Sequence, residues 1–274
     1  MIGTTFGATA LKIDLATQPI FSIWGFHVTN GMLTGAVSLM AMLLIFWYVT
    51  SMIRRGKTNH FVGLVRWAFE GMLAQIESVM PDKTHARRIA PLALTMFFYV
   101  LISYWMSILP GLDSITYNGT PVLRSIAADL NFTFAIAIIS LVTAQVYAIR
   151  QHGSFGNLKR YLRNPFRDPI GSFEGLLELI GEVSRYSALS LRLFGNCFAG
   201  EVLLVIMSVL TGYLSVVTLP IFMAFELFIG FIQAYVFFML TVIFTSLAIA
   251  SHEEHSKEHS PVGHLSSAAE NDTI

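Results

Sequence analysis

Long runs of apolar residues without a charge divide this chain into segments of membrane-spanning length. The first run covers residues 31–53, and two others cover 89–112 and 130–149. At 1.5 Å of rise per residue, a helix of each length crosses a hydrocarbon core of about 30 Å. We therefore predict a transmembrane helix over each of the three ranges.

Two longer helical stretches are predicted in the last third, at about 169–211 and 220–251, with a turn over 212–219 between them. Both exceed the length of an upright span, which favours a strongly tilted helical hairpin. Residues 61–80 instead carry apolar side chains at three- and four-residue spacings with charges between, the pattern of an amphipathic helix on a membrane surface. The expected fold class is an all-α polytopic membrane protein with about five transmembrane helices and one surface helix.

The two ends of the chain lack these patterns. Residues 1–30 contain no basic segment followed by an apolar core, so we interpret them as mature sequence rather than a signal peptide. Residues 31–255 are predicted to form a single transmembrane domain. Residues 256–274 are polar and are expected to be a disordered tail.

Basic residues in the loops predict the orientation of the helices. They cluster at 54–57 and 87–88, on both sides of the surface helix, and again at 159–167, after the third span. Because cytoplasmic loops carry an excess of Lys and Arg, these loops are placed in the cytoplasm. The N-terminus is then outside, and the C-terminus is cytoplasmic.

The composition agrees with a membrane protein and excludes several other classes. The chain has 274 residues, of which 54% are hydrophobic and 12% are charged. Its net charge of zero gives no basic face for nucleic acid, and its one cysteine, Cys197, excludes an internal disulfide and is interpreted as a small packing residue. We find no Gly-rich phosphate loop and expect no cofactor.

Four histidines in the C-terminal region could suggest a metal site. They are His252, His255, His259 and His264. A metal site needs a folded frame that holds its ligands in place, and this polar segment has none. We therefore interpret the segment as a solvated tail and predict no metal site.

Arg192 is a permanently charged residue within long, predominantly apolar sequence. Such a residue at bilayer depth costs a few kcal/mol on insertion scales, so it usually faces a protein interior or a water-filled path. We therefore interpret Arg192 as a candidate functional residue. The alternative is a structural ion pair inside a helix bundle.

Several polar residues share a face of the helix that contains Arg192. At 100° per residue, five of them fall within about 40° of one another: Glu174, Glu178, Arg185, Arg192 and Asn196. Glu201 lies roughly 180° around the helix from Arg192 and about 13 Å further along its axis. The helix thus offers two polar environments with Arg192 between them.

On the next predicted helix, Glu226 and Gln233 share a face, and Gly230 between them permits close packing. Antiparallel packing across the turn would bring Glu226 toward Glu201. This layout suits an ion path made of two half-routes that do not join. The structural alternative for the cytoplasmic end is a buried pair of Arg185 with Glu178 or Glu182.

Four sequence motifs carry a resemblance to a known family. They are Ser190-Leu-Arg-Leu-Phe-Gly-Asn-Cys-Phe-Ala-Gly-Glu201, Phe231-Ile-Gln-Ala-Tyr235, Ala90-Pro-Leu-Ala-Leu-Thr95 and Ala128-Asp-Leu-Asn-Phe-Thr133. Together they resemble the a subunit of bacterial rotary ATP synthases, the stator component beside the ring of c subunits. The resemblance covers roughly residues 60–255.

The resemblance implies a role for each candidate residue. Arg192 would be the essential arginine that faces the c-ring carboxylate, with Gln233 packed near it. The outer half-channel would contain Asn196, Glu201 and Glu226, where some members have histidine in place of Glu226, with Asp129 and Asn131 at its entrance. Glu178 would be the carboxylate of the inner half-channel, and Arg185 the basic residue between it and Arg192.

The same resemblance implies partners and a location. The expected partners are the c-subunit ring, the b subunits of the peripheral stalk and the lipid bilayer, in a bacterial inner membrane. The chain would carry protons without a catalytic site of its own.

Two other classes are compatible with the residues alone. In a secondary transporter or self-contained channel, Arg192 would bind an anionic substrate, but such transporters commonly have paired halves, whereas these polar residues concentrate in the last third. In a membrane scaffold, replacing Arg192 would harm folding without a specific loss of ion transfer.

Overall fold

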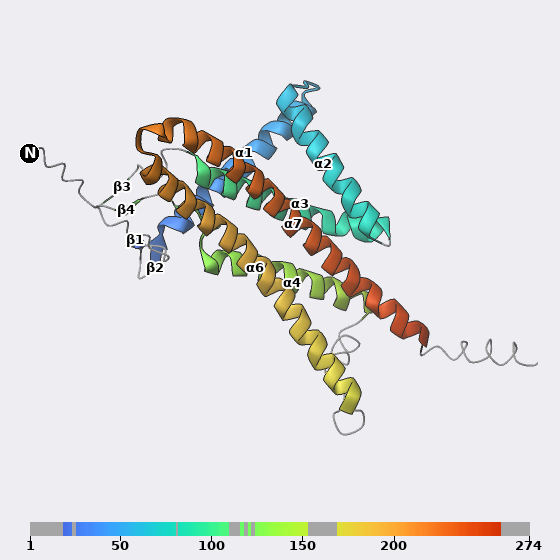
Figure 1. Cartoon of the computed structure of the whole chain (residues 1–274). Helices are drawn as coiled ribbons and strands as arrows, with labels where there is room; N and C mark the ends of the chain where they lie inside the picture. The colour runs from blue at the N-terminus through green and yellow to red at the C-terminus, as the bar shows by residue number, and fades with distance from the viewer. Residues whose placement is uncertain are drawn as a thin grey trace, which may run out of the picture.

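The structure is a computed structural model that describes residues 19–23, 26–80, 82–109, 116–117, 120–121, 124–152 and 169–258. Six α-helices dominate the described residues (Figure 1): α1 (Asn30–Arg54), α2 (His60–Val79), α3 (Lys83–Ile108), α4 (Leu130–His152), α6 (Pro169–Thr211) and α7 (Ser215–Glu258). A 3-10 turn, η1 (Gly212–Leu214), joins α6 to α7. Two short antiparallel hairpins complete the elements: β1 (Pro19–Ile23) with β2 (Phe26–Thr29), and β3 (Thr116–Tyr117) with β4 (Thr120–Pro121).

The predicted fold class is confirmed. The long, apolar helical stretches that can cross a membrane are Asn30–Arg54, Lys83–Ile108, Leu130–Tyr147 and Gly175–Leu247, the last of which contains most of α6 and α7. Helix α2 is too rich in polar residues to be among them and packs against α3 and α7. In Figure 1, α6 and α7 run side by side as the long C-terminal hairpin, and α4 crosses beside them.

The protein core lies where α3 meets α7. Phe97 of α3 packs edge to face against Phe238 of α7, with ring centroids 5.9 Å apart. Both rings are buried, as is Leu193, by which α6 joins the same cluster. In contrast, α1 keeps large apolar side chains such as Leu44 and Trp47 exposed, as expected for a helix that faces lipid.

Helix α3 begins at Lys83, six residues before the predicted start at residue 89. The backbone N–H of Thr84 donates to the Asp82 carboxylate at 3.3 Å, so Asp82 caps the helix. The same hydrogen bond holds the pKa of the Asp82 carboxyl below its ordinary value. The apolar pattern alone missed this start because the first turns of α3 are polar. The helix ends at Ile108, earlier than the predicted 112.

The predicted turn over 212–219 is wrong in its second half. Helix α7 begins at Ser215, so Pro220 lies inside the helix rather than at its first position. Proline is disfavoured inside a helix because it has no backbone N–H to donate. Pro220 lies close to the start of α7, where its presence removes only one hydrogen bond, the bond to the carbonyl of Val216.

The C-terminal boundary also differs from the prediction. Helix α7 continues to Glu258, past the predicted end at residue 251 and into the segment expected to be disordered. Polar residues at a helix end need no apolar partner, so the loss of hydropathy after residue 251 does not mark the end of the helix. Residues 259–274, with His259 and His264, lie outside the described residues.

The hairpin of β1 and β2 was not predicted for the N-terminal segment of residues 1–30. Its strands pair from Ile23 with Phe26 to Pro19 with Thr29. Helix α1 follows at once because the Thr29 hydroxyl accepts a hydrogen bond from the N–H of Met32 at 3.4 Å. Residues 1–18 lie outside the described residues.

Candidate functional site

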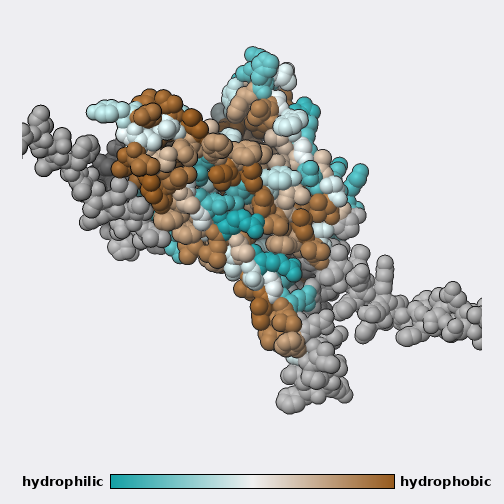
Figure 2. All heavy atoms as spheres, in the orientation of Figure 1, coloured by the Kyte–Doolittle hydropathy of each residue, from teal (hydrophilic) through white to brown (hydrophobic). Residues whose placement is uncertain are grey.

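Arg192 lies on α6 with its side chain exposed, between exposed Leu191 and fully buried Leu193. Among the described residues, no carboxylate lies within ion-pair distance of its guanidinium. Within the described residues, Arg192 therefore has no ion pair of the kind that its structural interpretation requires. Figure 2 shows hydrophilic residues in the middle of the otherwise apolar face over α6.

An amide pair joins α6 to α7 one turn from Arg192. The side-chain nitrogen of Asn196 donates to the side-chain oxygen of Gln233 at 2.9 Å. Gln233 is buried, and its own nitrogen, Nε2, has no hydrogen-bond partner among the described residues. A buried amide donor without a partner is unusual, because its desolvation is not offset. Here it lies on the helix pair that carries Arg192.

Glu226 is a buried carboxylate at the contact of three helices. The hydroxyl of Tyr104 on α3 donates to its Oε1 at 2.5 Å. On α6, a Cβ atom placed on Gly200 would overlap the Glu226 carboxylate, so the carboxylate rests directly on that glycine. The structure thus brings Glu226 to the residue next to Glu201, which is half-buried on α6.

Further polar groups surround this carboxylate. The Ser125 hydroxyl and the Cys197 thiol lie 3.0 Å apart, both buried. Glu201 and Glu226 both lie near the Cys197 thiol, as does Ser107 of α3. Cys197 is therefore part of a polar cluster, whereas the sequence suggested only a packing role. We call Tyr104, Ser107, Ser125, Cys197, Glu201 and Glu226 the carboxylate cluster.

Asp129 and Asn131 lie at the start of α4. The backbone N–H of Asn131 donates to the Asp129 carboxylate at 2.9 Å, so Asp129 caps this helix. The Asn131 side chain is exposed. A capping role is visible for Asp129, and it is compatible with a further role at a channel entrance.

At the other end of α6, three of the polar residues have described side chains. Glu178 is half-buried, and Glu182 accepts a hydrogen bond from the side-chain nitrogen of Gln145 on α4 at 2.7 Å. The Arg185 guanidinium lies over the Phe244 ring of α7, 5.5 Å from its centroid. The side chain of Glu174 is outside the described part of the structure.

Sequence reasoning missed Tyr104, Ser125 and Gln145. Each lies on a different segment from the carboxylate or thiol that it contacts. Their only signal in the sequence is a polar side chain within or next to an apolar run, which alone does not identify its partner.

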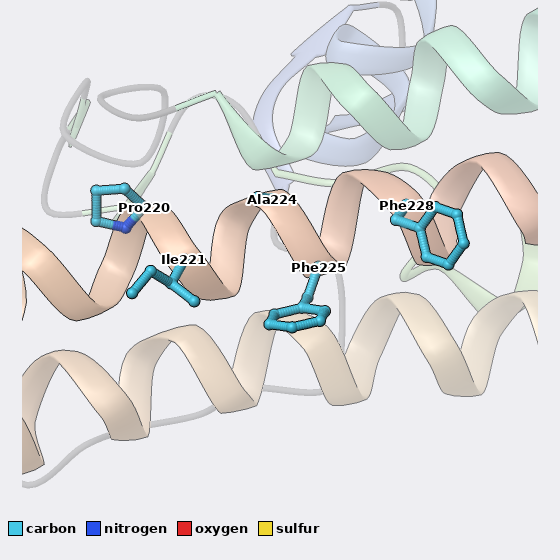
Figure 3. A pocket seen from close by; sticks show the side chains of 5 residues that line it. All are labelled: Pro220, Ile221, Ala224, Phe225 and Phe228. Atoms are coloured by element: carbon cyan, nitrogen blue, oxygen red, sulfur yellow. The ribbon is translucent and has the colours of Figure 1, made fainter.

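An apolar pocket lies along the same stretch of α7 that carries Glu226 (Figure 3). It is lined by Pro220, Ile221, Ala224, Phe225 and Phe228, all from the same helix. None of these side chains titrates or forms side-chain hydrogen bonds, so the pocket is not a candidate for proton chemistry.

The fold and these residues define a class: a polytopic helical membrane protein whose last two helices carry an exposed arginine, a cross-helix amide pair and a buried carboxylate. Such ionisable residues inside membrane spans mark an ion path in general. A family model described as ATP synthase A chain matches residues 32–246. The chain therefore belongs to the ATP synthase A chain family, the a subunits of the Fo membrane sector.

Individual relatives agree with the family model. The chain is 30% identical over 232 residues to ATP synthase subunit a of Mycobacterium ulcerans, covering 83% of this chain and 89% of the relative. It is 31% identical over 243 residues to the subunit of Aliivibrio salmonicida, covering 85% and 87%. For Mycobacterium leprae the identity is 35% over 186 residues, covering 67% and 71%.

Proposed function

We propose that this chain is the stator a subunit that couples transmembrane proton flow to rotation of the c-ring through two offset half-channels. The observation that carries the proposal is Arg192, an exposed cation on a membrane helix without an ion-pair partner among the described residues. A guanidinium in this position is costly unless an anion or water meets it. The c-subunit carboxylate is the anion that we infer.

The outer half-channel would run from Asp129 and Asn131 to Glu226 and Glu201, and then to Asn196. Carboxylates exchange protons, whereas the guanidinium of Arg192 keeps its proton at any physiological pH. Arg192 would therefore attract the ionised c-subunit carboxylate and block direct leakage to the inner half-channel. The Asn196–Gln233 hydrogen bond would hold the two helices together beside it.

The inner half-channel would use Glu178, with Arg185 between it and Arg192. Glu182 and Gln145, joined by a hydrogen bond at 2.7 Å, supply a second polar position at this end. A proton taken up from outside would neutralise the c-subunit carboxylate and let that subunit turn into lipid. After nearly a full turn of the c-ring, the same carboxylate would release its proton into the inner half-channel. The ionised carboxylate would then pass Arg192.

The remaining assignments follow from this role. The translocation domain would cover residues 31–255, with the N-terminus outside and the C-terminus in the cytoplasm of a bacterial cell whose inner membrane holds the complex. The partners would be the c-ring and the b subunits of the peripheral stalk. The subunit itself would be non-catalytic.

Replacing Glu226 by glutamine tests this path. Glutamine keeps the size of the side chain and a hydrogen-bond acceptor for Tyr104 but does not titrate. We expect ATP-driven acidification of vesicles that carry the assembled complex to fall roughly 100-fold or more, because about 100-fold is the lower end of what one proton-transfer group contributes.

The matched control is Glu70→Gln on α2, where the carboxylate is exposed and pairs with Arg66 at 2.7 Å. This variant should pump like the unmodified complex. Normal pumping by Glu226→Gln would remove Glu226 from the path and count against the outer half-channel as drawn.

A further inference from the structure

Tyr104 is a fully buried tyrosine whose hydroxyl reaches a functional carboxylate on another helix. Its ring lies against Gly230 of α7, where a Cβ atom would overlap the ring. Its hydroxyl donates to Oε1 of Glu226, one turn earlier on the same helix. The aromatic ring and the hydroxyl thus both contact α7, at two positions four residues apart.

Two glycines shape the site around this contact. Gly230 leaves room for the Tyr104 ring, and Gly200 on α6 leaves room for the Glu226 carboxylate. Each glycine is buried. Because α6 and α3 enclose the carboxylate in this way, its position depends on the Tyr104 hydroxyl and on the absence of a side chain at Gly200.

The titratable groups that face Glu226 come from two other helices. Tyr104 belongs to α3, while Cys197 and Glu201 belong to α6. The structure defines a hydrogen bond from Tyr104 to a Glu226 oxygen. A carboxyl group accepts a hydrogen bond at its carbonyl oxygen when protonated and at either oxygen when ionised. Oε1 therefore remains an acceptor for Tyr104 in both states.

We propose that Tyr104 is a positioning residue of the outer half-channel, which holds Oε1 of Glu226 in both protonation states so that Oε2 is the oxygen that exchanges the proton. This inference rests on the proposed function. The proton bound on Oε2 is taken from water on the outer side and passed on toward the c-subunit carboxylate. Tyr104 keeps its own proton throughout.

The test is Tyr104→Phe, which keeps the ring against Gly230 and removes only the hydroxyl. Passive proton conduction is measured in vesicles stripped of the catalytic head, per assembled complex, while the outer and inner pH are varied separately. Loss of one hydrogen bond to a charged group changes an equilibrium by roughly 10-fold. We expect conduction to fall by about that factor, with a changed dependence on outer pH and an unchanged dependence on inner pH.

The matched control is Tyr99→Phe on the same helix. The Tyr99 hydroxyl donates to the carbonyl of Gly35 on α1 at 3.3 Å, outside the carboxylate cluster. This variant loses a hydroxyl and one hydrogen bond as well, so it reports the general cost of such a change. It should conduct like the unmodified complex at every pH.

Normal conduction by Tyr104→Phe at every outer pH would overturn the inference, as would equal changes in the outer and inner pH dependence. Failure of this variant to assemble would assign the hydroxyl to folding and would overturn it too. The Glu226→Gln variant separates the two levels of the argument. If it blocks pumping while Tyr104→Phe does not, the proposed function stands and only the role of Tyr104 fails.

Discussion

Replacing Arg192 by alanine is expected to abolish ATP-driven proton pumping while the complex still assembles. The side chain is exposed and has no ion-pair partner among the described residues, so its removal leaves none of their buried carboxylates uncompensated. Under the proposed function, what is lost is the cation that meets the c-subunit carboxylate. The measurement is acidification of membrane vesicles after ATP addition, which should fall to the level of vesicles without the complex.

A second measurement separates the two roles proposed for Arg192, which are to block proton leakage and to attract the c-subunit carboxylate. In vesicles stripped of the catalytic head, the Arg192→Ala variant should leak protons faster than the unmodified complex, since no fixed charge separates the two half-channels. Arg66→Ala is the matched control, because Arg66 is an exposed arginine on α2, away from the polar face of α6. Pumping by Arg192→Ala at the normal rate would contradict the stator role, and loss of assembly would favour the scaffold interpretation.

Hydropathy predicted the helices of this chain well because burial in lipid requires long apolar segments with internally satisfied backbones. It predicted their ends less well. The start of α3 depends on the Asp82 cap, and the end of α7 continues through a polar segment as far as Glu258. Neither feature is apolar, so apolar periodicity carries little information about where these helices begin and end.

Part of the candidate site could be predicted from the sequence and part could not. Helical spacing put Arg192 and Asn196 on one face of a helix and Glu226 and Gln233 on one face of the next, because residues on one helix have a fixed angular relation. The partner of Glu226 on α3 is 122 residues away in sequence. Such a contact depends on how helices pack, and no spacing rule within one helix predicts it.

Glycine at position 200 is expected to be necessary for proton transfer. Even a Cβ atom there would overlap the Glu226 carboxylate, which is the flexible end of its side chain. Gly200→Ala should therefore displace the carboxylate from Tyr104 rather than unfold the helix pair. We expect pumping to fall roughly 10-fold, the effect of one lost hydrogen bond to a charged group, with normal amounts of assembled complex.

A compensating change makes this prediction specific. Aspartate at position 226 is one methylene shorter, so Glu226→Asp withdraws the carboxylate from α6 and should partly restore pumping in a Gly200→Ala chain. Gly181→Ala on the same helix is the control, because a Cβ atom there meets nothing within 4 Å. Equal losses in Gly181→Ala and Gly200→Ala would mean that helix flexibility, not room for the carboxylate, explains the glycine. Restored pumping when Glu226→Asp is added to Gly200→Ala would locate the defect at the contact between position 200 and the Glu226 carboxylate.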